Sequence, residues 1–275
     1  MVSIMPMIEF DDLLACLEIE SSAGDRYRLP NLKMPYHRIF GGQLIAQAIV
    51  MATHSAAGKA VKSIHALLPR TGDLAEPVEW ELERIQDGRS FAARSIVGRQ
   101  NDELIFSAQL SLHLPEDGPE HQVAFPDAGD PESATTVELS MVPWETRAAF
   151  GVDLQSREVG PPDYALWMRA PSVPHDQALH QALLAYSSTL TLIGTALRPH
   201  EGVSEADAQG RLQTAVTSHT LWFHRPLRMD KWLLLQQQSP CTAGARGFGL
   251  GHAFSSEGQL VASFAQESLI RPSSG

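Results

Sequence analysis

Few residues in this sequence have a spacing that could support catalysis. Asp176 and His180 stand four positions apart, so a helix would place a carboxylate and an imidazole on one face, where they could exchange protons with a substrate. Capping of the helix by Asp176 and core packing of His180 explain the pair with fewer assumptions, and we favour that explanation. No Gly-x-Ser-x-Gly sequence is present, which argues against a serine hydrolase of the α/β type.

Motifs for cofactors and metals are also missing. No phosphate-binding loop ends in Lys-Ser or Lys-Thr, and the eleven histidines show no metal-ligand spacing. Gly244, Gly247, Gly249 and Gly251 resemble a dinucleotide-binding loop, but such a loop opens a helix, and here the pattern continues into a strand. Strand glycines that let backbone or ligand approach closely explain them better. We expect neither a metal nor a cofactor.

Composition and charge exclude several classes of function. The net charge of −11 argues against a nucleic-acid surface, which needs a basic patch. Arg225, Arg228 and Lys231 could form a local pocket for a phosphorylated ligand, although solvated surface charge is the favoured explanation. Cys16 and Cys241 are too few for a disulfide framework or a zinc site, which fits a reducing cytoplasm.

Neither a membrane span nor a signal peptide is expected. No apolar run approaches the roughly 20 residues that a span needs. Residues 1–8 are apolar but short, without a basic segment before them. We interpret them as the lead-in to a first strand or helix.

The hydrophobic pattern of the first half predicts one buried helix followed by a meander of strands. Residues 40–54 are apolar or small on nearly every side, which indicates a helix that other elements must surround. Alternating segments then predict antiparallel strands with the helix on one face of their sheet, an α+β arrangement. The expected strands span residues 63–68, 78–83, 90–100 and 104–114.

The second half repeats this plan after a segment rich in proline and acidic residues. We interpret residues 118–150 as a linker with a short helical piece at 144–150. A second apolar helix is expected to begin at Asp176, its N-cap, and to continue to Leu190; a polar loop follows at 200–209. The expected strands span residues 152–159, 164–170, 217–223, 232–238, 247–255 and 259–270.

An internal echo suggests that the two halves are copies. Ala-Gln-Leu-Ser-Leu at residues 108–112 returns as Ala-Gln-Glu-Ser-Leu at 265–269, and at the same offset of 157 positions Phe91 falls on Phe248. The offset also pairs Gln109 with Gln266 and superimposes two turns. A repeat of this length indicates a duplicated fold with a pseudo-twofold axis. We therefore divide the chain into 1–117, the linker 118–150, and 151–275.

Two sets of motifs occur in order along nearly the whole chain. Those of the first half are Phe40-Gly41-Gly42-Gln43, Ser63-Ile64-His65, residues 87–94 and Gln100-Asn101. Those of the second half are Trp222-Phe223-His224-Arg225-Pro226, residues 245–248, residues 260–263 and Gln266-Glu267. Together they resemble the motifs of the type II (TesB-like) acyl-CoA thioesterases. The resemblance implies a double hotdog, in which two long buried helices, each wrapped by an antiparallel sheet, form an internal pseudo-dimer.

The resemblance also implies a catalytic site in which an aspartate, a hydroxyl residue and a glutamine activate water. Gln266 matches the glutamine, but Thr189 stands at the aspartate position and Pro240 at the hydroxyl position. Thr189 cannot act as a base near neutral pH, although its hydroxyl can bind water. Thr242, two residues beyond Pro240, is expected on the same strand face and could replace the hydroxyl. Glu267 should face away from Gln266, as a surface ion-pair partner.

Substrate contacts are assigned to Gly41, Gly42 and Arg246. A turn without side chains at Gly41-Gly42 lets a thioester reach backbone N–H groups, and tight packing of a helix start explains it equally well.

These residues are compatible with three functions. The leading hypothesis is hydrolysis of fatty acyl-CoA by an activated water, weakened by the loss of the aspartate or helped by a base from elsewhere. The alternative is an acyl-CoA-binding protein with little or no hydrolysis, and hydration of an enoyl thioester by Asp176 and His180 ranks last. The resemblance also implies a homo-oligomer, in the cytoplasm.

Overall fold

Two buried helices form the centre of the protein. The computed structural model describes residues 8–34 and 38–273, so most of the lead-in predicted for residues 1–8 lies outside the described residues. Helix α2 (Gly41–His54) and helix α3 (Gln177–Ser188) pack against each other. The predicted N-cap is confirmed, because the Asp176 carboxylate accepts a hydrogen bond from the backbone N–H of Ala178 at 2.8 Å.

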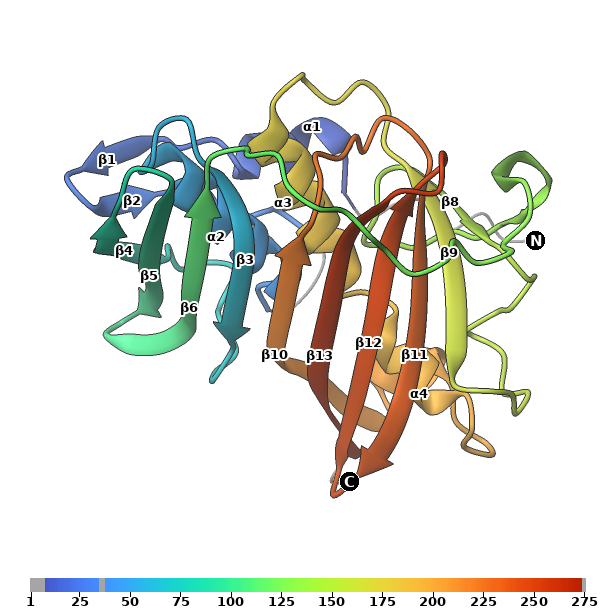
Figure 1. Ribbon diagram of the computed structural model, residues 1–275. Coiled ribbons are helices and arrows are strands. Elements are labelled where there is room, and N and C mark those ends of the chain that lie inside the picture. The colour runs from blue at the N-terminus through green and yellow to red at the C-terminus, as the bar shows by residue number, and fades with distance from the viewer. Residues whose placement is uncertain (1–7, 35–37, 274–275) are drawn as a thin grey trace.

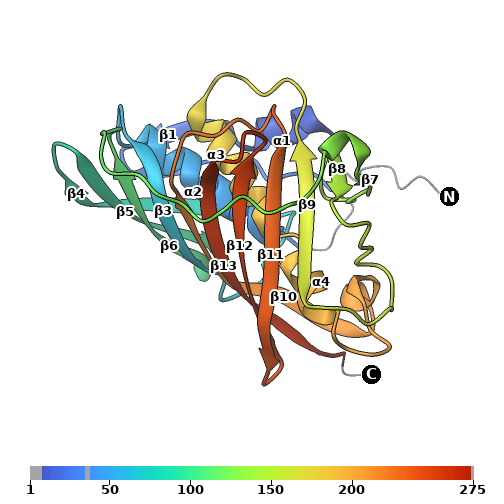
Figure 2. The same cartoon turned by 45° about the vertical axis from the view of Figure 1, so that its right-hand side comes forward.

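Both helices lie on the same face of one continuous 13-stranded sheet (Figures 1 and 2). The halves join where β3 (Ala60–Leu67) pairs antiparallel with β10 (Leu212–Phe223). Outward from β3 lie β6 (Glu103–His113), β5 (Phe91–Gln100), β4 (Glu79–Asp87), β2 (Arg26–Arg28) and β1 (Ser21–Ala23). Outward from β10 lie β13 (Leu260–Pro272), β12 (Arg246–Ser255), β11 (Leu233–Ala243), β9 (Asp163–Arg169), β8 (Glu145–Ala148) and β7 (Thr135–Thr136).

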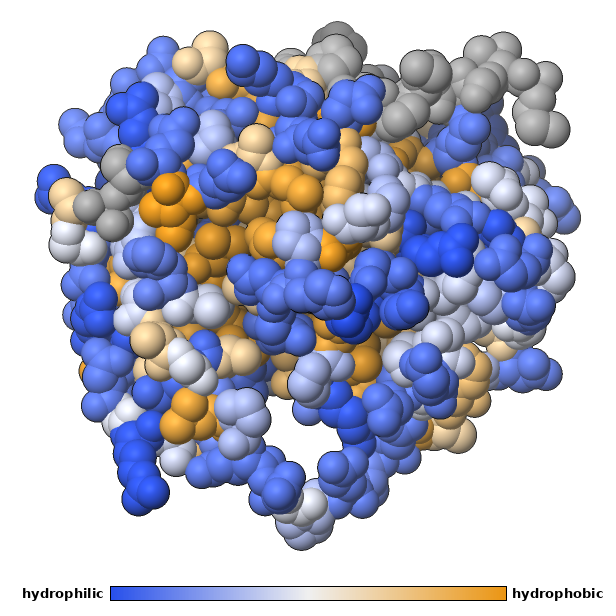
Figure 3. All heavy atoms as spheres, turned by 90° about the horizontal axis from the view of Figure 1, so that it is seen from above, coloured by the Kyte–Doolittle hydropathy of each residue, from blue (hydrophilic) through white to orange (hydrophobic). Residues whose placement is uncertain are grey.

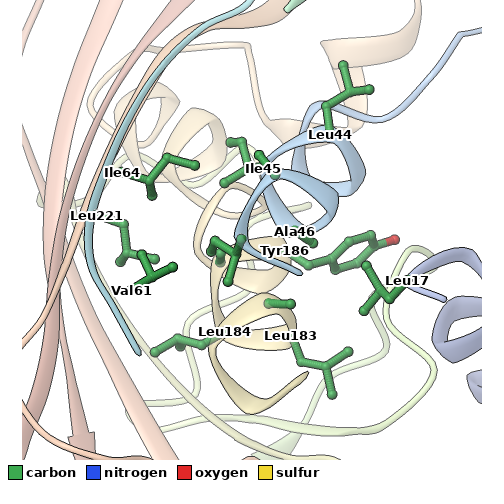
Figure 4. Packing of buried hydrophobic residues seen from close by; sticks show 14 of the residues in the cluster. Leu17, Leu44, Ile45, Ala46, Val61, Ile64, Leu183, Leu184, Tyr186 and Leu221 are labelled. Atoms are coloured by element: carbon green, nitrogen blue, oxygen red, sulfur yellow. The ribbon is translucent and has the colours of Figure 1, made fainter. Parts of the chain in front are cut away.

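The core fills the space between the helices and the sheet. Ile64 of β3 and Leu221 of β10 are cross-strand partners and fully buried. Figure 4 shows them facing the helices, where Ile45 of α2 and Leu184 of α3 meet them. The two halves therefore share one hydrophobic core rather than having separate ones.

Parts of the sequence prediction for residues 144–197 are wrong. Residues 144–150 contain strand β8 instead of a helical piece, because Trp144, Thr146 and Ala148 are buried while the residues between them are not, a period of two. Residues 152–159 form no strand. A short helix, α4 (Leu192–Leu197), was not predicted.

Three further short helical elements complete the described chain. They are α1 (Phe10–Cys16), the 3-10 helix η1 (Pro131–Ser133), and the 3-10 helix η2 (Glu205–Gln209), which lies in the predicted polar loop. In the part of the chain that the structure describes, no helix is long and apolar enough to cross a membrane.

Residues 118–150 follow β6 and precede β9 in the chain. Figure 1 shows this green segment passing from β6 in front of the second-half strands before it reaches β8. Strands β7 and β8 then extend the sheet beyond β9. The division at residues 117 and 150 stays a prediction.

The sequence repeat at an offset of 157 positions aligns the two copies only in part. The predicted turn at Asn101 and Asp102 is confirmed, with φ of 48° and 64°, the conformation of a tight hairpin turn. Phe91 and Phe248 both point outward, with 42% and 41% of their surface exposed. Gln109, however, is exposed on the outer face, whereas Gln266 is buried on the inner face. Their proposed equivalence is wrong, because a one-residue difference in register reverses the face of a strand residue.

The glycines of β12 serve packing, as predicted. A Cβ atom on Gly249 would lie 2.7 Å from the Leu192 side chain, and one on Gly247 would lie 3.2 Å from Ala196. Both contacts are with α4, so the missing side chains let this helix lie directly on the strand.

Candidate active site

The candidate site lies where the start of α2 meets the end of α3. Thr189 is the C-cap of α3, and its hydroxyl donates a hydrogen bond to the carbonyl of Tyr186 at 2.9 Å. A Cβ atom on Gly42 would lie 2.8 Å from the Thr189 hydroxyl oxygen and 2.7 Å from that carbonyl oxygen. The absence of a side chain at Gly42 is thus what allows the two helix ends to touch.

The two helices begin differently. Asp176 caps α3, whereas among the described residues no side chain caps the start of α2 at Gly41. The first N–H groups of a helix have no partner within it, and the helix dipole makes that end positive. The start of α2 therefore offers uncapped N–H donors beside Thr189, as an oxyanion would require.

Gln266 reaches the same place from strand β13. Its side chain is 1% exposed, and its Nε2 lies 3.5 Å from the carbonyl oxygen of Thr189 and 3.0 Å from the hydroxyl oxygen of Ser268. Its Oε1 lies 3.0 Å from Nδ1 of His219 on β10. The fold thus brings together Gln266, Thr189 and Gly42 from three separate elements.

His219 and Ser188 belong to this cluster and were missed by the sequence analysis. The Ser188 hydroxyl oxygen lies 2.9 Å from Nε2 of His219, and both residues are fully buried. Burial lowers the pKa of His219 to about 4, despite the hydrogen bond with Gln266. The imidazole is therefore neutral at pH 7. The sequence carried a signal for His219, because this residue alternates with Leu221 and Phe223 on the inward face of a strand. A polar side chain buried on such a face needs a polar partner.

Thr242 does not take the place of Pro240 in this cluster. The register of β11 shifts between Gln238 and Cys241, and this bulge separates the faces of the two residues. Pro240 is an exposed strand residue, and Thr242 lies on the inner face. The Thr242 hydroxyl donates to the Ala196 carbonyl in α4 at 3.4 Å. The buried hydroxyl next to Pro240 in β11 is that of Ser239, which donates to the Phe248 carbonyl at 2.8 Å.

Arg246 lies on the outer side of the sheet, away from the cluster. Its guanidinium forms an ion pair with Glu267 at 3.2 Å, and both side chains are largely exposed. The predicted surface role of Glu267 is confirmed. A contact between Arg246 and substrate stays a prediction.

The other residues considered from sequence have structural partners. His180 Nδ1 accepts a hydrogen bond from the Met229 N–H at 3.1 Å, so with the capping role of Asp176 the pair is explained without catalysis. Arg225 pairs with Glu120 at 3.0 Å and Arg228 with Asp230. Their charges are thus balanced locally. Among the described residues no group of histidine, cysteine and acidic side chains could hold a metal.

A cavity of about 1080 Å³ opens at the opposite end of α3. Gln177 and Gln181 line it, whereas Thr189, Gln266 and Gly42 do not. Figure 3 looks onto the upper end of the molecule in Figure 1, where apolar side chains form an area inside a polar rim. The cavity and the buried polar cluster are therefore separate features.

Comparisons with known proteins match both halves of this chain. A family model described as acyl-CoA thioesterase matches residues 143–269, and one described as the acyl-CoA thioesterase N-terminal domain matches residues 31–113. Acyl-CoA thioesterase 2 of Haemophilus influenzae is 31% identical, over 95% of this chain and 97% of its own. Human acyl-coenzyme A thioesterase 8 is 30% identical, over 93% and 87%.

Solved structures agree with the sequence comparison. Acyl-CoA thioesterase II TesB2 from Mycobacterium marinum superimposes with a TM-score of 0.81 at 32% identity, over 96% of this chain and 99% of its own. A protein of hot dog fold from Alicyclobacillus acidocaldarius, 17% identical, has a TM-score of 0.77 over 95% and 98% of the two chains. The predicted double hotdog is confirmed.

The contact at Gly42 predicts a large difference between two neighbouring substitutions. Gly42→Ala is expected to lower the free energy of unfolding by about 1–3 kcal/mol, because its methyl group would press on a backbone carbonyl. Gly41→Ala is the matched control, since the only close contact of its methyl group would be the flexible end of the Leu68 side chain, at 2.7 Å, with Val216 at an ordinary 4.0 Å. Urea denaturation measures both. Equal losses in the two variants would contradict the tight helix contact.

Burial of a neutral imidazole at His219 predicts a loss of stability in acid. The pKa of His219 in the folded protein lies below its value in the unfolded chain. Between about pH 6.5 and pH 4 the unfolded state therefore binds an extra proton, which lowers the free energy of unfolding. From pH 7 to 5 the wild type should lose about 2 kcal/mol more than His219→Gln. Denaturant unfolding at the two pH values measures this. Parallel losses would show that His219 titrates normally.

Proposed function

We propose that this chain, which belongs to the acyl-CoA thioesterase family, hydrolyses fatty acyl-CoA to the free acid and CoA. The observation that carries the proposal is the convergence of Gln266, Thr189 and the uncapped start of α2 at one buried point. These are the positions at which the family resemblance places a glutamine, an aspartate and the substrate contact. Acyl-CoA is the proposed ligand, and its chain length is open to assay.

The reaction needs a water oxygen to attack the thioester carbonyl carbon. Electrons of the C=O bond move to its oxygen, and the N–H groups at the start of α2 would hold that charge. Collapse of the tetrahedral intermediate breaks the C–S bond, and the proton lost by water ends on the departing thiolate. Thr189 Oγ can accept a hydrogen bond from the water and orient it.

Removal of the water proton is the weak step. The Thr189 hydroxyl does not ionise near pH 7, and it already donates to the Tyr186 carbonyl. The titratable side chain found in contact with Gln266 is His219, whose lowered pKa makes it a poor base. Hydrolysis should therefore be slow unless the substrate rearranges the site.

The second candidate is an acyl-CoA-binding protein with little hydrolysis. Thr189 in place of a carboxylate favours it, as does the full set of hydrogen bonds around Gln266. Release of free CoA over a series of acyl chain lengths separates the two functions. Binding by calorimetry without release above background at high protein concentration would support the binding protein and exclude the enzyme.

Thr189→Asp is expected to raise the rate of hydrolysis by at least about tenfold, as a positioned general base typically contributes a factor of 10² or more. The uncapped start of α2 beside residue 189 would stabilise the carboxylate. CoA release is the readout. Thr189→Asn, which has similar size but cannot accept the proton, is the control and should not gain. A gain with Asn would refute the base assignment, and no gain with Asp would place the site elsewhere.

Gln266→Ala is expected to reduce hydrolysis by about tenfold or more, because the amide that faces Thr189 is lost. Gln109→Ala is the control, since Gln109 lies on the outer face and should leave the rate unchanged. Steady-state CoA release compares them at matched folded fractions. An undiminished rate in the Gln266 variant would remove this residue from the mechanism.

We also propose a homo-oligomer in the cytoplasm. The outer sheet face supports an oligomer, because Phe91, Trp222 and Phe248 are partly exposed on it. Two free cysteines, one of them exposed at Cys241, support a reducing compartment. Analytical ultracentrifugation tests the oligomeric state.

A further inference from the structure

We propose that His219 is a positioning residue for Gln266, and that its Nδ1–H tautomer, held by Ser188, sets which way the Gln266 amide points. This inference rests on the proposed function, because it assigns His219 a part in the same site. His219 acts through Gln266 and contacts no reacting atom.

The orientation of the Gln266 amide follows from its neighbours. One end of the amide faces the Thr189 carbonyl oxygen, which can only accept a hydrogen bond. The NH₂ group must therefore be at that end, where it also reaches the Ser268 hydroxyl at 3.0 Å. The oxygen Oε1 is left facing His219. A flipped amide would set two carbonyl oxygens against each other.

The tautomer of His219 must match this amide orientation, and the matching tautomer holds Oε1 in place. Oε1 can only accept, so Nδ1 of His219, 3.0 Å away, must carry the proton. A neutral imidazole then has a bare Nε2, which needs a donor. The Ser188 hydroxyl, 2.9 Å away, can supply it. With the opposite tautomer, Nδ1 and Oε1 would both be acceptors and would repel each other.

Ser188 has a second partner, which competes with Nε2 of His219 for the hydroxyl hydrogen. Its hydroxyl lies 2.9 Å from the carbonyl of Ala185, one turn back in α3. A hydroxyl has one hydrogen, so donating to Nε2 leaves this helix bond unmade. The tautomer therefore depends on the last turn of α3, the turn that also places Thr189.

Packing alone does not require a polar pair here. His219 and Gln266 are cross-strand partners, both facing the core. On the inner face of the first copy, the cross-strand pairs of β3 and β6 are Ile64 with Leu110 and Ala66 with Ala108, all apolar. A buried polar pair costs desolvation that an apolar pair does not. Its presence only in the copy that contains Thr189 points to a role in the site.

Two substitutions separate the roles of the ring nitrogens. The side-chain NH₂ of Asn reaches roughly the position of Nδ1, whereas that of Gln extends toward the position of Nε2. His219→Asn should therefore keep CoA release within about threefold of wild type. His219→Gln should lose about tenfold in kcat with little change in KM, like Gln266→Ala. Thermal melts of both variants correct for any loss of folded protein.

A measurement without turnover tests the same point. The ¹⁵N spectrum of histidine-labelled wild-type protein, assigned with the His219 variants, should show a protonated Nδ1 and an unprotonated Nε2 at neutral pH. In Ser188→Ala the Nε2 resonance should shift as it loses its donor. A proton on Nε2, or a Gln variant as active as the Asn variant, would overturn the proposal. If wild type releases no CoA, the proposed function fails and the spectrum alone decides the tautomer.

Discussion

The contact between the first turn of α2 and the last turn of α3 is the constraint on which the site depends. A side chain at Gly42 would collide with the Tyr186 carbonyl and the Thr189 hydroxyl, so only glycine lets the helices meet this closely. The contact turns the positive end of one helix toward the C-cap of the other. It also places Thr189 within reach of Gln266, because α3 and β13 are packed in the same core.

The duplicated fold has become asymmetric at the level of single residues. The start of α3 is capped by Asp176, while no side chain in the described part of the chain caps the start of α2. The inner cross-strand positions are apolar in the first copy and carry His219 and Gln266 in the second. An uncapped helix end and a buried polar pair each lower the stability of the fold, so a function must account for their presence. Both features occur together at one end of the helix pair, which is why we place the reaction there.

Strand parity explains where sequence reasoning fell short. The echo between residues 108–112 and 265–269 suggested that Gln109 and Gln266 are equivalent, yet they face opposite sides of the sheet. Thr242 was expected on the face of Pro240, and a bulge in β11 separates their faces. Residues 144–150 were expected to be helical although their burial alternates. Each error concerns a register or a period that a neighbouring element decides, so local pattern could not reveal it.

The sequence by itself determined the fold class, the two buried helices, the Asp176 cap, the central meanders and the family. These follow from local periodicity, capping chemistry and motifs, which are readable in order along the chain. The tertiary structure alone decided which polar groups meet. Ser188, His219 and Gln266 belong to three different elements, and their hydrogen bonds exist only because α3, β10 and β13 pack in one core. Contacts between distant segments are set by packing and register, for which one sequence carries no local signal.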